Sequence, residues 1–348
     1  MTEGPLLRVR DLAVEFGTGA AMTRPLDGIS FEVGRGEVVG IVGETGCGKT
    51  LTGLSILGIL PAGAVISRGS IDFDGVDLAS LPSRELERIR GRRIAMVFQN
   101  PATALNPVFT IRTQIEHVVR RHLELSGRDI RDHVRETLVS VGLPETERVL
   151  RSYPHQLSGG MLQRAMIAMA LSCGPELLIA DEPTTALDVT IGAQVLDLLR
   201  RLQESRGFSV VFVTHDLGVV RTVTDRVVVL YAGRVAEEAP TTDLLRAPLH
   251  PYSEGLIGAV PRPDRRGRAL AMIPGSVPTD PARIAGCVFV DRCPIVIDRC
   301  RVERPLVRPV GAADRLVACH LAGERTRRVD FGADPGPESS AAGGGAYL

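Results

Sequence analysis

The chain has 348 residues, of which 44% are hydrophobic and 24% are charged, as in ordinary globular proteins. This length allows one large domain and a smaller appendage. Its 41 basic residues balance its 41 acidic residues, so the charge gives no reason to expect nucleic acid as a partner.

No secretory leader is expected, because the first residues, MTEGPLLRVRDL, lack a basic start followed by an apolar core. The longest apolar stretch, residues 51–66, is interrupted by glycine and proline. It falls short of the ~20 apolar residues that a membrane-spanning helix needs. We therefore expect a chain that does not cross a membrane by itself.

Short β-branched runs alternate with helical patterns over residues 1–250, which predicts an α/β fold with a parallel core. Continuous apolar runs, typical of strands buried on both faces, occur at residues 38–42, 94–98, 177–180 and 210–214. Residues 7–16 and 29–33 alternate more and suit an antiparallel flank. Residues 104–172 lack strand patterns, so we expect them to form an inserted helical subdomain.

Residues 43–50 read GETGCGKT and fit the phosphate-loop pattern, between an apolar run and a helical pattern. Glycines in such a loop let backbone N–H groups turn toward phosphate oxygens at a helix N-terminus. Lys49, the only lysine in the chain, would place its charge on the β- and γ-phosphates, and Thr50 would ligate Mg²⁺. The alternative is a glycine-rich turn that only resembles the motif. The candidate phosphate-binding residues are Gly43, Glu44, Thr45, Gly46, Cys47, Gly48, Lys49 and Thr50.

The segment LLIADEP, residues 177–183, places two acidic residues at the end of a predicted buried strand. Open α/β sheets bind their ligands at the carboxyl ends of strands. Asp181 is expected to hold Mg²⁺ through water, and Glu182 to polarise the attacking water. The alternative is a strand that ends in a solvated acidic turn.

The segment LSGGMLQR, residues 157–164, resembles the signature motif of ABC ATPases, which other phosphate-loop proteins lack. The resemblance continues through Gln99 in VFQNP, Asp188 in ALD and His215 in THD, and it covers residues 6–245. It implies a mixed sheet flanked by helices, with an antiparallel β flank, that binds ATP and Mg²⁺. Asp188 is therefore a further candidate residue of the nucleotide site.

The resemblance also implies that two subunits sandwich two ATP molecules. Ser158, Gly159 and Gly160 would present a hydroxyl and backbone N–H groups at a helix N-terminus to a γ-phosphate. That phosphate would belong to the ATP held by the opposite subunit, because the signature lies on the inserted helical subdomain, away from its own phosphate loop.

Three further residues receive roles from the resemblance. Gln99 would sense Mg²⁺ and the attacking water, and His215 would contact the γ-phosphate and hold Glu182 in line. Phe16 would stack on adenine, although a phenylalanine in a strand is more often part of the core.

Longer segments are similar to the ATPases of oligopeptide and dipeptide importers, including FQNPATALNPVFTI and HPYSEGLIGAVP. The similarity extends through IPGSVP, GCVFVDRCP and VACH to residue 320. It implies a peripheral protein on the cytoplasmic face of a bacterial membrane, with three kinds of partner: a paralogous ATPase in a heterodimer, two permeases and an extracytoplasmic peptide-binding protein. The alternatives are an importer of nickel complexes or glutathione, and a soluble ABC ATPase that acts on DNA or ribosomes.

Residues 251–321 are expected to form a C-terminal extension, followed by a disordered tail at 322–348. The extension contains Cys287, Cys293, Cys300 and Cys319, and in a cytosolic chain such cysteines indicate metal rather than disulfides. Their spacing lacks the paired knuckles of zinc sites, and the proline after Cys293 suits an iron–sulfur cluster. The resemblance to importer ATPases that carry a 4Fe–4S cluster in this region supports the same prediction. Zinc and a site without metal remain the alternatives.

Overall fold

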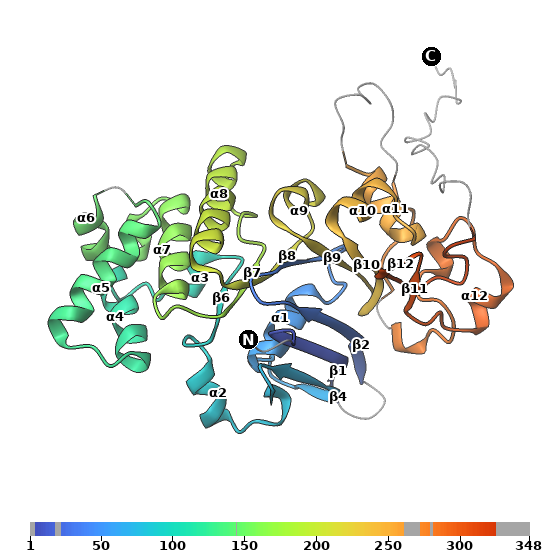
Figure 1. Ribbon diagram of the computed structural model, residues 1–348, viewed down its shortest axis with the longest axis horizontal. Helices are drawn as coiled ribbons and strands as arrows, with labels where there is room; N and C mark the ends of the chain where they lie inside the picture. Colours follow the sequence, from blue (N-terminus) through green and yellow to red (C-terminus); the bar gives the residue numbers. More distant parts are fainter. Residues whose placement is uncertain (1–3, 18–21, 144, 261–271, 279–280, 325–348) are drawn as a thin grey trace, which may run out of the picture.

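The computed structural model describes residues 4–17, 22–143, 145–260, 272–278 and 281–324, which form two sheets covered by helices (Figure 1). The smaller sheet has the strand order β2-β1-β4-β5, and the larger has the order β11-β12-β10-β9-β3-β8-β7-β6. Most of the tail predicted at 322–348 lies outside the described residues. The strands are β1 (Leu7–Phe16), β2 (Thr23–Val33), β3 (Val38–Val42), β4 (Ala64–Phe73), β5 (Val76–Asp77), β6 (Ile94–Val97), β7 (Leu177–Asp181), β8 (Ser209–Thr214), β9 (Arg226–Tyr231), β10 (Arg234–Pro240), β11 (Arg308–Val310) and β12 (Ala312–Val317).

Helices cover both faces of the larger sheet. The α-helices are α1 (Lys49–Leu57), α2 (Ser83–Ile89), α3 (Pro101–Ala104), α4 (Ile111–His122), α5 (Gly127–Ser140), α6 (Thr146–Arg151), α7 (Gly159–Leu171), α8 (Val189–Arg206), α9 (Leu217–Val223), α10 (Thr241–Arg246), α11 (Pro251–Gly258) and α12 (Asp298–Val302). Short 3₁₀ turns are η2 (Leu78–Ser80), η3 (Pro154–Gln156), η5 (Pro281–Arg283) and η6 (Val290–Arg292).

The centre of the larger sheet is parallel and buried on both faces. Strand β3 pairs in parallel with β8 and β9, and β7 pairs in parallel with β6 and β8. Successive residues of β6 enter different cores: Ile94 and Met96 pack on one face, Ala95 and Val97 on the other. This double burial explains the continuous apolar runs and confirms the predicted strands.

The antiparallel flank is also confirmed, because β1 pairs in antiparallel register with β2 and β4. Strand β2 begins at Thr23, earlier than the predicted start at residue 29. Helix α1 packs between the two sheets, since its Ile56 and Leu57 share a core with residues of both.

The interval predicted to be helical forms α4 to α7, which Figure 1 shows grouped at one end of the molecule. The C-terminal extension lies at the other end, beyond β10 (Figure 1). Helix α1, which follows the phosphate loop, lies between these two ends (Figure 1).

The extension does not stand apart from the residues before it. Its strand β12 pairs with β10, and β11 pairs with β12, so the larger sheet continues into the extension. Phe289 of the extension packs in one core with Tyr231 of β9 and Tyr252 of α11. A segment that is too short to bury a core of its own thus shares one with the preceding domain.

No helix in the described part of the chain is both long and apolar enough to span a bilayer.

Candidate active site

The phosphate loop joins the end of β3 to the start of α1, as the sequence predicts. Gly43 has φ 155°, and a Cβ there would lie 2.2 Å from the carbonyl oxygen of Leu230, so only glycine fits. Lys49 is buried, and its Nζ donates hydrogen bonds to the carbonyl oxygens of Gly43 (2.8 Å) and Glu44 (3.0 Å). The lysine is thus held over the loop whose N–H groups would face the phosphates.

A pair of oxygen ligands lies beside this loop. Thr50 Oγ1, at the first turn of α1, donates a hydrogen bond to Asp181 Oδ1 at 3.1 Å. Burial raises the pKa of Asp181, and the hydrogen bond from Thr50 opposes this shift. Hydroxyl and carboxylate oxygens are the donors that Mg²⁺ prefers, so these two residues could hold the metal that accompanies a nucleotide.

Glu182 is the centre of a hydrogen-bonded group formed by three predicted residues. Gln99 Nε2 donates to Glu182 Oε2 at 2.8 Å, and His215 Nδ1 hydrogen-bonds with Glu182 Oε1 at 2.8 Å. Thr185 Oγ1 also donates to Oε2, at 2.9 Å. The structure thus brings together residues from the ends of β6, β7 and β8 at one edge of the parallel sheet, as expected for an α/β ligand site.

The conformation and ionisation of Glu182 are unusual in ways that suit chemistry. Its φ of 43° lies in the left-handed region, which costs a residue with a side chain about 1–3 kcal/mol and is often found at functional sites. Burial alone would raise the pKa of Glu182, but the hydrogen bonds from His215 and Thr185 outweigh burial and lower it. The side chain is therefore a carboxylate at neutral pH, ready to accept a proton or a hydrogen bond from water.

The signature residues lie elsewhere. Ser158 caps α7, whose N-terminus is built from Gly159 and Gly160. A Cβ at Gly160 would lie 2.6 Å from Cγ2 of Ile191, so the start of α7 packs closely on the start of α8. Asp188 caps α8 by accepting from the N–H of Ile191 at 2.9 Å. Figure 1 shows α7 within the helical end, away from α1 and its phosphate loop.

Phe16 is the last residue of β1 and is partly buried. It packs against the core that also contains Cys47 of the phosphate loop. Its predicted role in stacking on adenine stays a prediction.

The four cysteines of the extension gather around one small pocket, which Cys287, Cys293, Cys300 and Cys319 all line. Burial, followed by the neighbouring Cys300, Cys293 and Cys319, raises the pKa of Cys287 to about 12. A Cβ at Gly286 would lie 2.2 Å from the carbonyl oxygen of Cys300, so glycine lets two of the cysteine segments approach each other. Within the described ranges, no group of three or more histidine, cysteine or acidic side chains is placed to hold a metal ion.

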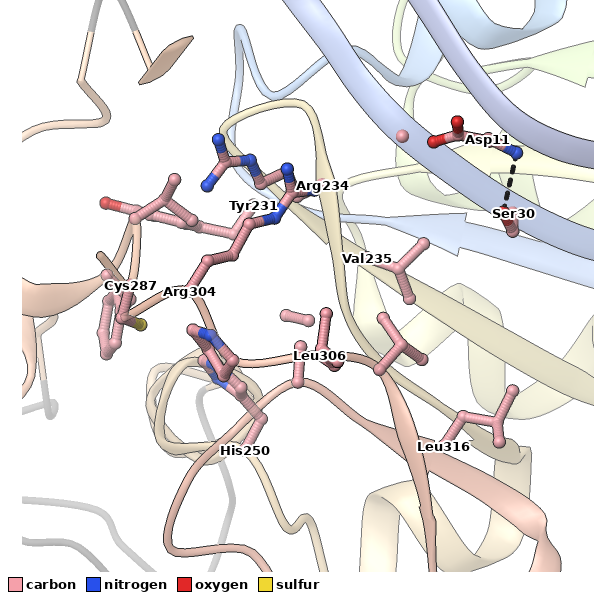
Figure 2. A pocket seen from close by; sticks show the side chains of 17 residues that line it. Asp11, Ser30, Tyr231, Arg234, Val235, His250, Cys287, Arg304, Leu306 and Leu316 are labelled. Carbon is pink, nitrogen blue, oxygen red and sulfur yellow. Dashed lines mark hydrogen bonds between the residues drawn. The ribbon is translucent and has the colours of Figure 1, made fainter. Parts of the chain in front are cut away.

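A cavity of about 520 Å³ lies at the junction between the extension and the preceding strands, not at the phosphate loop (Figure 2). Arg234 of β10 and Arg304 of the extension lie close together at this cavity. Both donate hydrogen bonds to the buried Asp27 Oδ2, at 2.7 and 3.2 Å. This ionic cluster fastens the extension to β2.

Two contacts with the site residues were not predicted from the sequence. Thr185 lies three residues after Glu182, within the segment DEPTTALD, and this proximity was the only available signal. Tyr252 Oη accepts a hydrogen bond from the N–H of Glu44 at 2.8 Å. Nothing in the spacing of the sequence connects a tyrosine of α11 with the phosphate loop, because the contact spans 208 residues.

Comparison with protein families gives two matches. Residues 26–185 match the family described as ABC transporter, and residues 236–300 match the C-terminal region of oligopeptide/dipeptide transporters.

Curated relatives match over most of their length. The chain is 49% identical to the "Probable peptide ABC transporter ATP-binding protein y4tR" of Sinorhizobium fredii, covering 88% of this chain and 92% of the relative. It is 45% identical to the oligopeptide transport ATP-binding protein AppD of Bacillus subtilis, covering 91% and 96%. It is 47% identical to the dipeptide transport ATP-binding protein DppD of the same organism, covering 84% and 89%.

Among solved structures, a dimeric ATP-binding cassette in a post-hydrolysis state with ADP and Pi is 32% identical. Its TM-score is 0.61, and the match covers 68% of this chain and 98% of that one.

Proposed function

Because this chain belongs to the ABC transporter family, as an ATP-hydrolysing subunit with the C-terminal region of oligopeptide/dipeptide transporters, we propose that it powers the import of dipeptides and oligopeptides. The observation behind the proposal is identity of 45–49% to peptide transport ATPases over 84–91% of the chain, including the extension.

The predicted residues of the phosphate loop and of the group around Glu182 have roles in this proposal. The phosphate loop with Lys49 binds the β- and γ-phosphates, while Thr50, Asp181 and Gln99 hold Mg²⁺. Glu182 polarises the attacking water, and His215 keeps the Glu182 carboxylate in line. Mg²⁺ would supply the positive charge that offsets the charge developing on the transferred phosphoryl group. The hydrogen bonds from Gln99 and His215 to Glu182 support this assignment.

The active unit is a dimer in which each ATP is shared between subunits. The helix N-terminus at Ser158, Gly159 and Gly160 would face the γ-phosphate bound by the other subunit, with Asp188 nearby. The position of α7 away from its own phosphate loop supports this arrangement (Figure 1). A paralogous ATPase is the proposed partner, so the dimer would be a heterodimer.

Transport then requires proteins outside this chain. We propose that the dimer docks on the cytoplasmic face of the membrane against two permease subunits, which receive peptides from an extracytoplasmic binding protein.

Coupling to transport has a direct test. The dimer is added to the outside of vesicles that contain the cognate permeases and enclose the binding protein. Peptide enclosed with the binding protein should raise ATP turnover several-fold. Nickel complexes, glutathione, DNA and ribosomes, each added in place of peptide, serve as comparisons. Stimulation by one of these and not by peptide would contradict peptide import.

The four cysteines of the extension are proposed to hold a 4Fe–4S cluster. Four thiols around one pocket form the donor set of such clusters. Such a cluster would cross-link the segments that carry the four cysteines. Zinc in the same pocket is the alternative.

Metal analysis of protein purified without oxygen distinguishes these cases. We expect about four irons and four acid-labile sulfides per chain. Cys293→Ser should remove them, whereas the matched control Cys173→Ser, a buried cysteine outside the extension, should retain them. One zinc per chain without iron would show that the cysteines form a structural zinc site and not a cluster. Protein without metal would show that the cysteines only pack against each other.

A further inference from the structure

Arg292 joins the extension to the phosphate loop. Arg292, in η6, donates to both carboxylate oxygens of Glu44, from Nη1 at 2.6 Å and from Nη2 at 2.9 Å. The arginine is only 6% exposed, and Glu44 is the second residue of GETGCGKT. A bidentate contact of this kind fixes both the distance and the orientation of the carboxylate.

Arg292 is itself held firmly. Its Nε donates to the carbonyl oxygen of Pro274 at 2.8 Å, and its Nη2 donates to that of Ile273 at 3.2 Å. The guanidinium also lies over the ring of Tyr231, with 5.6 Å from its central carbon to the ring centroid. Tyr231 and Cys287 lie at the same end of the junction cavity in Figure 2. The position of Glu44 is therefore determined by the packing of the extension.

Glu44 is held at its backbone as well. Its N–H donates to Tyr252 Oη, and its carbonyl oxygen accepts from Lys49 Nζ. A displacement of Glu44 would thus move an acceptor of the lysine that is placed to bind phosphate. Without Arg292, the Glu44 carboxylate would also be left uncompensated in the loop that receives a polyanion, and like charges repel.

We propose that Arg292 is a positioning residue of the ATP site, which holds and neutralises Glu44 so that the phosphate loop accepts nucleotide. The extension then contributes to nucleotide binding by the ATPase. This inference builds on the proposed role of the loop in binding ATP, but it does not depend on the cargo or on a metal in the extension.

The test measures the Kd of a fluorescent ATP analogue with the full-length protein. Arg292→Ala should raise the Kd about tenfold, as expected when a group that orients a binding loop is lost. Glu44→Gln should raise the Kd less than Arg292→Ala does, because it removes the carboxylate charge and keeps one oxygen that accepts from Arg292. Arg292→Ala combined with Glu44→Gln should bind better than Arg292→Ala alone, since the uncompensated charge is gone. Arg292→Lys should restore part of the affinity, because lysine keeps the charge without the bidentate geometry.

Arg304→Ala is the matched control. Arg304 also joins the extension to a carboxylate of the preceding domain, but its partner is Asp27 on β2. It should lower the melting temperature and leave the Kd within twofold. If Arg292→Ala lowers the melting temperature and leaves the Kd unchanged, the contact is purely structural and the proposal is wrong. The proposal would also be wrong if the effects of the Arg292 and Glu44 changes on the free energy of ATP binding were strictly additive. If the wild-type protein binds ATP but no permease responds to it, the proposed function fails and this inference stands.

Discussion

Glu182→Gln is expected to lower the kcat of ATP hydrolysis by a factor of about 10²–10⁴, the usual contribution of a positioned general base. The amide has nearly the same shape, so the contacts with Gln99 and Thr185 can largely persist, but it cannot accept a proton from water at neutral pH. Nucleotide affinity should change little, because among the described residues the hydrogen bonds of the Glu182 side chain go to Gln99, Thr185 and His215 and not to the phosphate loop. The uncleaved ATP should therefore accumulate between two subunits.

Two measurements check this result: the steady-state rate of phosphate release, and the molar mass in solution with ATP and Mg²⁺. Mixed with the paralogous partner ATPase, ATP and Mg²⁺, the variant should form a dimer under conditions in which the wild-type protein does not. Glu204→Gln, an exposed position on α8, serves as the control and should behave as wild type. A normal hydrolysis rate for Glu182→Gln would show that another group polarises the water.

Lys49→Ala is expected to act on binding and to raise the Kd for ATP about 10–100-fold. The estimate follows from the 1.5–3 kcal/mol that hydrogen bonds to charged groups contribute. Lys49 Nζ now donates to two carbonyl oxygens of its own loop, and phosphate oxygens would compete for the same ammonium. Its removal leaves those carbonyl oxygens without this donor and the phosphates without a point charge.

Equilibrium titration with a fluorescent ATP analogue measures this loss, and Lys49→Arg provides a stringent comparison. The guanidinium keeps the charge but is larger and planar, so it should not rescue binding in a buried loop. Since Lys49 is the only lysine, selective ¹⁵N-lysine labelling of the wild-type protein gives one side-chain NMR signal, which should shift when ATP is added. An affinity for ATP that is unchanged in Lys49→Ala would contradict the phosphate-binding role.

The sequence predicted the parts of the fold that depend on local patterns. Apolar runs such as Val38–Val42 mark strands because both faces of the central sheet are covered, and each run became a strand at nearly the predicted residues. The phosphate loop was predicted because glycine, lysine and threonine must occur at fixed spacing around a phosphate. Glu182 was predicted from its place at the end of a buried strand, and Gln99 and His215 from the resemblance. Only the structure shows that the three share hydrogen bonds.

Contacts between distant segments were not predictable in this way. The pairing of β12 with β10 joins residues about 80 positions apart, and neither strand has a pattern that identifies its neighbour. Arg292 is one of many arginines, and its contact with Glu44 spans 248 residues. The four cysteines were predicted to act together, but their shared pocket depends on the close approach permitted at Gly286.

The continuation of the larger sheet into the extension limits how these proteins can be rearranged by evolution or by engineering. A chimera in which everything after residue 250 is replaced by a segment without an edge strand would leave β10 unpaired on one side. An unpaired strand edge can pair with strands of other molecules and cause aggregation. The replacement would also remove Arg315, which donates a hydrogen bond to Glu237, a completely buried carboxylate of β10. Grafting an extension from another transporter ATPase should succeed only when the donor brings a matching edge strand and a matching counter-ion. The two regions thus share one sheet and one core, even though they match two separate families.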